Sequence, residues 1–297
     1  MNKYQIFTDS SSDLTTEMRK EYEIDYFRMG ILVDGKEYPA DLDFKEFSPE
    51  QLYEWVRNPE IKIQTSLITA TEFINRMRPY LDQGMDILYI ACTSVLSGSV
   101  NFFRFAAEEI QAEYPDRKMI AIDSSRAGMP LGLLVMDAVK LQREGKCLEE
   151  VKEFVEKEKL KYNLCGTVPT LTYLKNAGRV SGAAAFFANL FNIKPIIIAD
   201  TMGHNYAVEK VNGTKKALSR LFEIVKETTE GIENPVIYVG QGMAQETSDY
   251  FKKRLTEELR ATIVEYWVGP IIGISCGPGV IHLAYFGKEV TITSPEK

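Results

Sequence analysis

The first half of the chain repeats one local pattern: an extended segment leads into hydroxyl side chains and then into a helix. In the clearest copy, an apolar run over 87–91 precedes the loop Thr93-Ser94-Val95-Leu96-Ser97-Gly98-Ser99 and a helical segment over 100–113. Similar hydroxyl loops occur at 8–13, 65–66 and 123–128. Strands that alternate with helices predict a parallel sheet covered on both faces, and such sheets bind ligands beyond the carboxyl ends of their strands. We therefore expect a ligand crevice at these loops.

The loop over 93–99 has the chemistry of a site for a small anion. Its hydroxyls donate hydrogen bonds, and the following helix start offers unpaired N–H groups and a partial positive charge. Because the loop contains no lysine or arginine, we expect one carboxylate or one phosphate rather than a polyphosphate. The alternative is that Thr93 or Ser94 serves only as the N-cap of the helix.

The second half of the chain is different. Strands are expected at 196–199, 236–239, 263–268 and 280–286, and helices at 217–228 and 247–259. Hairpin-like pairs predict a mixed or antiparallel sheet with helices on one face. We expect an α/β fold of two domains, an N-terminal one over 1–163 and a C-terminal α+β one over 164–297 that closes over the ligand. The apolar segment 183–192 is either a tunnel wall or ordinary core.

Charge and cysteine usage exclude several classes of protein. The net charge of the 297-residue chain is −7, which argues against binding nucleic acid or an anionic membrane surface. Its four cysteines are scattered without a C-x-x-C pair, so neither a disulfide framework nor a zinc site is expected. Apolar runs stay below about 18 residues and a strand is predicted from Tyr4. These features predict a cytoplasmic protein with no signal peptide and peripheral membrane contact at most.

Motifs that would indicate catalysis are weak. Gly273-Ile274-Ser275-Cys276-Gly277 matches G-x-S-x-G, but a nucleophile elbow is followed by a helix, whereas Pro278-Gly279 and a strand follow here. The two histidines, His204 and His282, have no carboxylate at metal-ligand spacing, so no metal is expected. His282 is expected to be a satisfied core or edge residue. The chain has no P-loop or dinucleotide fingerprint, which disfavours nucleotide cofactors.

Several segments, in the same order, resemble the DegV family of bacterial fatty-acid-binding proteins. They are Thr8-Asp9-Ser10-Ser11-Ser12-Asp13-Leu14, Thr65-Ser66 with Glu72-Phe73, Ser94-Val95-Leu96-Ser97-Gly98-Ser99, Asp123-Ser124 with Gly128 and Gly132, Leu174-Lys175-Asn176-Ala177-Gly178-Arg179-Val180-Ser181, and Gly277-Pro278-Gly279. Each motif is weak alone, but the ordered set spans nearly the whole chain and is specific.

The resemblance implies a binding protein without cofactor or catalytic residues, which holds a long-chain fatty acid between two α/β domains. In several members a dihydroxyacetone-kinase-like fatty acid kinase phosphorylates the bound carboxylate, which implies a carrier. Carried over by position, the candidates for binding the carboxylate head group are Thr65, Ser66, Ser94, Ser97, Gly98, Ser275, Cys276 and Gly277, with Arg179 and Ser124 as further candidates.

The chain departs from the family pattern in three places. Ser275-Cys276 replaces the usual His-Thr before Gly-Pro-Gly, Leu67-Ile68 replaces Gln-Pro, and Asn212 stands where an arginine is usual. A histidine donor for the carboxylate is therefore lost. Two alternatives stay open: a lipid-responsive sensor or adaptor, and an enzyme that acts on a small acyl or phosphate compound through Ser275 or Cys276.

Overall fold

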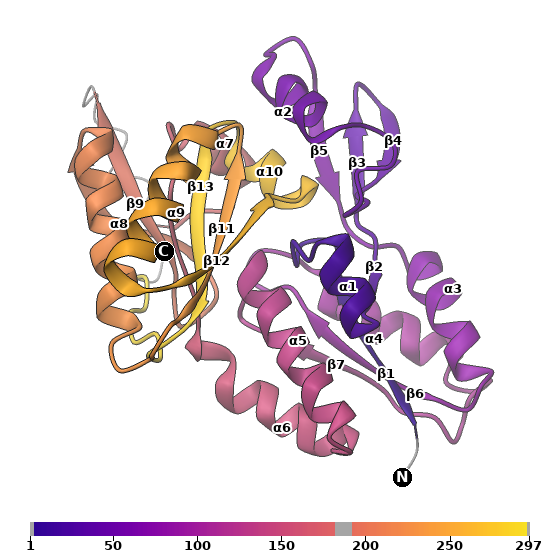
Figure 1. Cartoon of the computed structure of the whole chain (residues 1–297). Helices are drawn as coiled ribbons and strands as arrows, with labels where there is room; N and C mark the ends of the chain where they lie inside the picture. The colour runs from indigo at the N-terminus through magenta and orange to yellow at the C-terminus, as the bar shows by residue number, and fades with distance from the viewer. Residues whose placement is uncertain (1–2, 182–191, 296–297) are drawn as a thin grey trace.

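A four-stranded parallel sheet forms the centre of the N-terminal part of the chain in the computed structural model, which describes residues 3–181 and 192–295 (Figure 1). Its strands, in spatial order, are β2 (Asp25–Phe27), β1 (Tyr4–Asp9), β6 (Asp86–Ala91) and β7 (Met119–Asp123). All neighbouring pairs are parallel. Every residue of β6 is buried, which is typical of a strand with helices on both sides.

Helices cover both faces of this sheet, as the alternating pattern predicts. They are α1 (Thr16–Tyr22), α3 (Ala70–Leu81), α4 (Ser99–Ile110), α5 (Met129–Arg143) and α6 (Leu148–Glu158). α3 and α4 pack together on one face, and α5 packs with α1 and α6 on the other (Figure 1). The N-cap of α4 is Gly98, without a side-chain cap. The alternative that Thr93 or Ser94 only caps this helix is therefore wrong.

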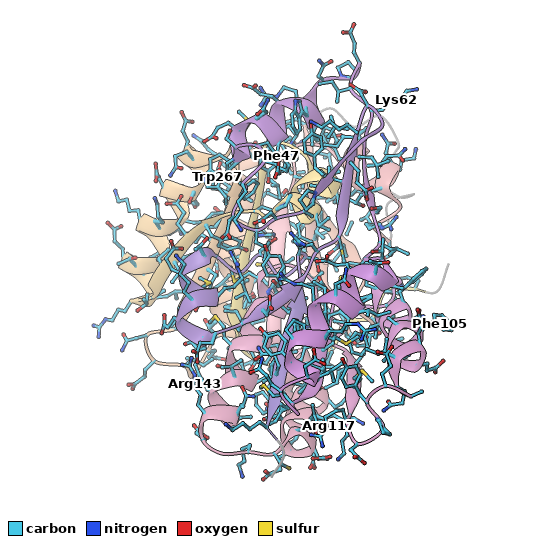
Figure 2. The ribbon with its side chains drawn as sticks, turned by 90° about the vertical axis from the view of Figure 1, so that its right-hand side faces the viewer. Phe47, Lys62, Phe105, Arg117, Arg143 and Trp267 are labelled. Atoms are coloured by element: carbon cyan, nitrogen blue, oxygen red, sulfur yellow. The ribbon has the colours of Figure 1, made fainter. Side chains whose placement is uncertain are left out.

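A second, small sheet extends from the N-terminal part. Its strands are β4 (Lys36–Pro39), β3 (Gly30–Val33) and β5 (Ile63–Ser66), all antiparallel, with α2 (Pro49–Arg57) beside them. Thr65 and Ser66 thus lie in a strand and not in a loop after one. Figure 2 shows Lys62, just before β5, near the outer tip of this sheet, far from Arg117 and Arg143 at the opposite end.

The C-terminal part is built on a six-stranded mixed sheet. Its strands, in spatial order, are β10 (Asn205–Asn212), β9 (Ile193–Ala199), β8 (Tyr162–Thr167), β13 (Val280–Phe286), β11 (Val236–Gly242) and β12 (Thr262–Trp267). Only the pair β11–β12 is parallel among these described strands. α8 (Thr214–Thr228) and α9 (Gln245–Leu259) lie on one side of the sheet, whereas α5 of the N-terminal part contacts β8 and β13. The predicted division into domains at 163/164 stays a prediction; β8 follows a short 3₁₀ turn, η1 (Lys159–Lys161).

Two short helices lie where the two parts of the chain meet, α7 (Thr172–Ala177) and α10 (Pro270–Cys276). The stretch 269–279 contains four glycines, a composition typical of a loop. However, α10 begins at Pro270 and ends before Gly277, which has φ of 76°. Helices commonly have proline at their first position and glycine just after their last. Most of the apolar segment 183–192 lies outside the described residues. No helix among the described residues is long and apolar enough to cross a membrane.

Candidate ligand-binding site

Two hollows lie between the N- and C-terminal parts, on either side of the pair Ser275–Cys276 at the end of α10. Ser275 lines a groove of about 780 Å³, bounded by the segment from α2 to β5 and by α7. Cys276 lines a smaller cavity, with about 40 Å³ of free space for the centres of water molecules. Two consecutive residues of one helix thus line the two hollows.

The groove has a cationic lining. Arg57, Lys62 and Arg179 line it, and the described lining residues include no aspartate or glutamate. The whole chain carries a net charge of −7, so the positive charge of the groove is opposite in sign to that of the chain. Cations without acidic partners attract an anion.

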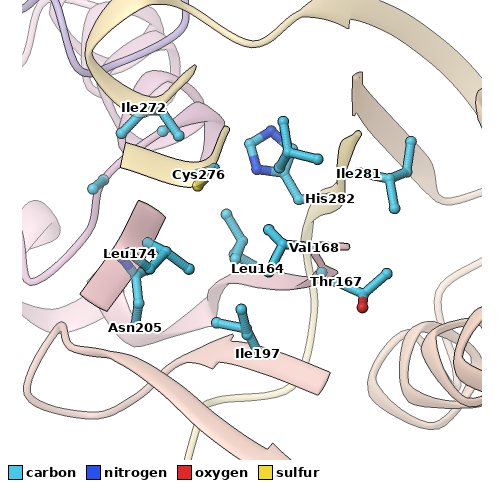
Figure 3. Close-up of a pocket in the computed structure, with 14 residues that line it drawn as sticks. Leu164, Thr167, Val168, Leu174, Ile197, Asn205, Ile272, Cys276, Ile281 and His282 are labelled. Atoms are coloured by element: carbon cyan, nitrogen blue, oxygen red, sulfur yellow. The ribbon is translucent and has the colours of Figure 1, made fainter. Parts of the chain in front are cut away.

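The cavity, in contrast, is mainly apolar (Figure 3). Its apolar side chains include Leu164, Val168, Leu174, Ile197, Ile272 and Ile281. The polar side chains at its wall include Asn205, Cys276 and His282. This composition suits a hydrocarbon group with few polar atoms.

The structure brings three of the sequence-predicted head-group residues into the groove: Thr65 from β5, Arg179 after α7, and Ser275 from α10. The Ser275 hydroxyl donates to the Ile271 carbonyl at 3.2 Å. Gly277 holds the wall of the groove, because a Cβ there would fall 2.1 Å from Cδ2 of Tyr173, which lines the groove.

The loop over 93–99 lies beside the groove. Arg179 Nε donates to the Leu96 carbonyl at 3.1 Å, which joins this loop to the C-terminal part. Ser94 is exposed, and its N–H donates to Asp123 Oδ2 at 3.2 Å. The Ser97 hydroxyl lies 3.0 Å from that of Ser99.

Six of the ten predicted residues line neither hollow. Five of them are Ser66, Ser94, Ser97, Gly98 and Gly277. Ser124 is also buried away from both, and its hydroxyl donates to the Arg126 carbonyl at 3.0 Å. Their assignment to the carboxylate stays a prediction.

A row of residues across the C-terminal sheet, which sequence reasoning missed, brings a histidine to the cavity. Gly166, His282, Gly240 and Tyr266 are neighbours on four adjacent strands. Because Gly240 has no side chain, the Tyr266 hydroxyl reaches across it to His282 Nε2 at 2.6 Å. Burial lowers the pKa of His282 to about 4, so the imidazole is neutral near pH 7. His282 is thus a buried, hydrogen-bonded residue, as expected.

Asp13, from the loop after β1, completes this cluster. Its carboxyl Oδ1 accepts from the Gly269 N–H at 3.0 Å, and Oδ2 lies 4.0 Å from His282 Nε2. Burial raises the pKa of Asp13 well above its usual range, which favours the protonated carboxyl. The expectation that neither histidine has a carboxylate nearby is wrong in space, because Asp200 Oδ2 also lies 3.4 Å from His204 Nδ1. Sequence spacing does not detect the pair of Asp13 and His282, which the fold brings together from distant segments, whereas Asp200 stands four residues before His204.

The turn at Ser275–Cys276 is poorly equipped for nucleophilic catalysis. Burial raises the pKa of Cys276 to about 12, and the thiol rather than the reactive thiolate is therefore present near pH 7. Ser275 lies in the last turn of α10, which leads into β13 through Gly277. A nucleophile elbow has the reverse order, from strand to helix. This geometry disfavours a hydrolase.

Comparisons with known proteins agree on one family. The family model described as "Uncharacterised protein, DegV family" matches residues 3–288. A DegV domain-containing protein of Clostridium perfringens is 32% identical over 291 residues, covering 97% of this chain and 98% of that protein. A solved fatty-acid-binding DegV family protein from Thermus thermophilus has 26% identity and a TM-score of 0.83, covering 96% of this chain and 99% of that one. A stearic-acid-binding protein from Eubacterium ventriosum, at 24% identity, shares the fold with a TM-score of 0.85, covering 96% of this chain and 98% of that one. The chain belongs to the DegV family.

Proposed function

We propose that this chain binds a long-chain fatty acid between its N- and C-terminal parts, with the carboxylate in the groove and the acyl chain in the cavity. The observation that carries this proposal is that the consecutive residues Ser275 and Cys276 line a cationic hollow and an apolar one. A fatty acid has the same two-part chemistry. The similar protein from Thermus thermophilus is described as binding fatty acid, which supports the same ligand class here.

Arg179 is the central group for the carboxylate in this proposal. It lines the groove together with Thr65 and Ser275, and its bond to the Leu96 carbonyl keeps the loop over 93–99 at the groove edge. Ser66 directly follows Thr65 in β5, so we assign its hydroxyl and those of this loop to the same carboxylate. A hydrogen bond to a charged group contributes about 1.5–3 kcal/mol, so a few such donors suffice to orient the carboxylate.

The acyl chain supplies most of the binding energy. Each buried CH₂ contributes about 0.8 kcal/mol, so a long chain provides on the order of 10 kcal/mol before association costs. The cavity now has room for only a few water molecules, with about 40 Å³ for their centres. Binding must therefore widen the cavity, and the energy of burying the chain is large enough to drive that change.

The proposed role is that of a cytoplasmic carrier rather than an enzyme. Because the groove holds the carboxylate end, a dihydroxyacetone-kinase-like partner would reach the head group from this side. Ser275 stands where relatives usually have histidine, and Asn212 of β10 stands where they usually have arginine. Phosphoryl transfer from such a kinase to the carboxylate therefore needs a hydrogen-bond donor other than that histidine, which Arg179 can provide. The raised pKa of Cys276 argues against the alternative of an acyl-handling enzyme.

Replacing Arg179 with methionine is expected to weaken stearate binding roughly ten- to a hundredfold, because one charge-assisted hydrogen bond is lost. Titration calorimetry on delipidated protein measures this change. Arg104→Met is the matched control, because Arg104 lies on α4 and bonds Asn101 of the same helix. Arg179→Lys is expected to recover part of the affinity through its charge. Equal stearate affinity for wild type and Arg179→Met would contradict the placement of the carboxylate.

A further inference from the structure

A tyrosine of the N-terminal part is buried within the C-terminal part. Tyr53 lies on α2 and is 0% exposed. It belongs to an apolar cluster whose other buried members, among the described residues, all lie between Val168 and Val280. The Tyr53 hydroxyl donates to the Val268 carbonyl at 3.3 Å. This side chain therefore anchors α2 of the N-terminal part in the C-terminal part.

Two glycines form the slot that holds the ring of Tyr53. A Cβ at Gly242, at the end of β11, would lie 2.4 Å from both Cζ and the hydroxyl oxygen of Tyr53. A Cβ at Gly273, within α10, would lie 2.7 Å from the same oxygen. Because carbon atoms in contact lie about 3.5–4.0 Å apart, a side chain at either position would displace the ring. The ring thus fits closely between β11 and α10.

Tyr53 connects two walls of the groove. One wall is the segment from the end of α2 to β5, which includes Thr65. Another wall includes Ser275, which follows Gly273 in α10. α2 packs against α10, and β5 contacts the same helix. The position of the Tyr53 ring therefore affects how far Thr65 lies from Ser275.

We propose that Tyr53 is a positioning residue: its ring holds Thr65 and Ser275 at the separation at which both hydroxyls bind the carboxylate. A hydrogen bond weakens steeply as its distance and angle change, so a displacement of about 1 Å is enough to remove one. Tyr53 acts through these two walls and not by touching the ligand. This inference rests on the proposed function, because it assumes that the carboxylate lies in the groove.

The test compares stearic acid with stearyl alcohol, which has the same chain without the carboxylate. Both are supplied as cyclodextrin complexes to delipidated protein, and calorimetry measures their dissociation constants. The dissociation constant of the alcohol divided by that of the acid reports how well the carboxylate is bound. A change that disturbs only the fold or the cavity lowers both affinities and leaves this ratio unchanged.

Gly273→Ala is the main variant, because its methyl group meets the Tyr53 hydroxyl. Alanine is otherwise favoured within a helix, and Gly273 is not one of the glycines with positive φ. The ratio is expected to fall roughly tenfold, since about one hydrogen bond to the carboxylate is lost. Tyr53→Leu, which leaves part of the slot empty, is expected to lower the ratio as well.

Tyr53→Phe serves as the rescue. It removes the oxygen that lies 2.7 Å from the added methyl group and leaves Cζ at 3.0 Å, so a small shift of the ring suffices. The double variant Gly273→Ala/Tyr53→Phe is therefore expected to recover the wild-type ratio to within about twofold. Trp55→Phe is the matched control. Trp55 lies on the same helix but packs against Phe47 and Tyr38, with ring centroids 5.3 and 5.9 Å apart, and this variant is expected to keep the wild-type ratio.

Two results would overturn the proposal. If Gly273→Ala and Tyr53→Leu keep the wild-type ratio, or if Tyr53→Phe does not restore the ratio in Gly273→Ala, then Tyr53 supports only the fold. The positioning proposal is then wrong, whereas the proposed function stands. If wild type binds neither ligand, or binds both equally, the proposed function itself is wrong.

Discussion

Replacing Arg126 with methionine is expected to lower the free energy of unfolding by about 3 kcal/mol. Arg126 is completely buried between the two parts of the chain. Its Nε donates to the Lys159 carbonyl at 2.9 Å, and Nη1 donates to the carbonyls of Ser125 and Asp200 at 2.7 and 2.9 Å. Methionine fills much of the space but removes the donor of three carbonyls. The Asp200 carbonyl is buried and the other two are partly buried, and a buried carbonyl without a partner costs about 1–3 kcal/mol. Burial of the guanidinium is unfavourable for its charge and lowers the pKa of Arg126 to about 10. Methionine carries no charge, and the removal of this cost offsets part of the loss.

Urea unfolding followed by tryptophan fluorescence measures this change. Trp55 belongs to α2 and Trp267 to β12, so the signal reports on both parts of the chain. Arg104→Met on the surface of α4 is the control and is expected to stay within about 0.5 kcal/mol of wild type. A similarly small effect of Arg126→Met would mean that water replaces the guanidinium, and that Arg126 does not hold the two parts together.

Asp13→Asn is expected to gain stability relative to wild type as the pH rises. Burial raises the pKa of Asp13 above its usual value. Above about pH 4 the unfolded chain therefore releases a proton that the folded chain retains, and wild type loses stability by up to about 1.4 kcal/mol per pH unit. This loss continues until the pH passes the folded pKa. Asparagine has no such proton, and its amide oxygen can still accept from the Gly269 N–H.

The measurement is urea unfolding of both proteins between pH 4 and 8, and the difference between them is the result. His282 also titrates, and its contribution is lost as pH falls from about 6.5 towards about 4. Because its Nε2 lies 4.0 Å from Asp13 Oδ2, the difference between the two proteins is read above about pH 7, where His282 is neutral in the folded and the unfolded chain. Asp200→Asn serves as a contrast. Burial alone would raise the pKa of Asp200, but hydrogen bonds from Ser294 and His204 lower it. The stability that this ionised carboxylate contributes is lost only below about pH 4, so the difference between Asp200→Asn and wild type is expected to be flat between about pH 5 and 8. A flat difference for Asp13→Asn would show that Asp13 is ionised in the folded protein.

The sheets were predictable from sequence because their strands carry their own signal. The apolar run of β6 and the hairpin-like pairs of the second half specify a parallel and a mixed sheet. The helix α10 was missed because seven residues between glycines read as a loop. Helices this short are marginal in isolation, and burial of Ile271 and Ile274 at the junction of the two parts stabilises this one.

The candidate site was also only partly predictable, because some of its residues are brought together by contacts between the two parts of the chain and not by a local sequence pattern. Motifs with fixed spacing identified Thr65, Arg179 and Ser275, which the structure places in one groove. The pair Asp13 and His282 depends on contacts between the two parts, and on Gly240, which lets Tyr266 reach His282. No local pattern encodes such a contact.

The most direct test of the proposed function is mass spectrometry of the purified protein, first in the native state and then after extraction with organic solvent. The account predicts a native mass that exceeds the mass of the chain by one fatty acid, and the extract identifies that acid. A chain that purifies without lipid and takes up no added stearic acid would contradict the proposed function. The groove and cavity would then bind a different small anion, although the chain would still belong to the DegV family.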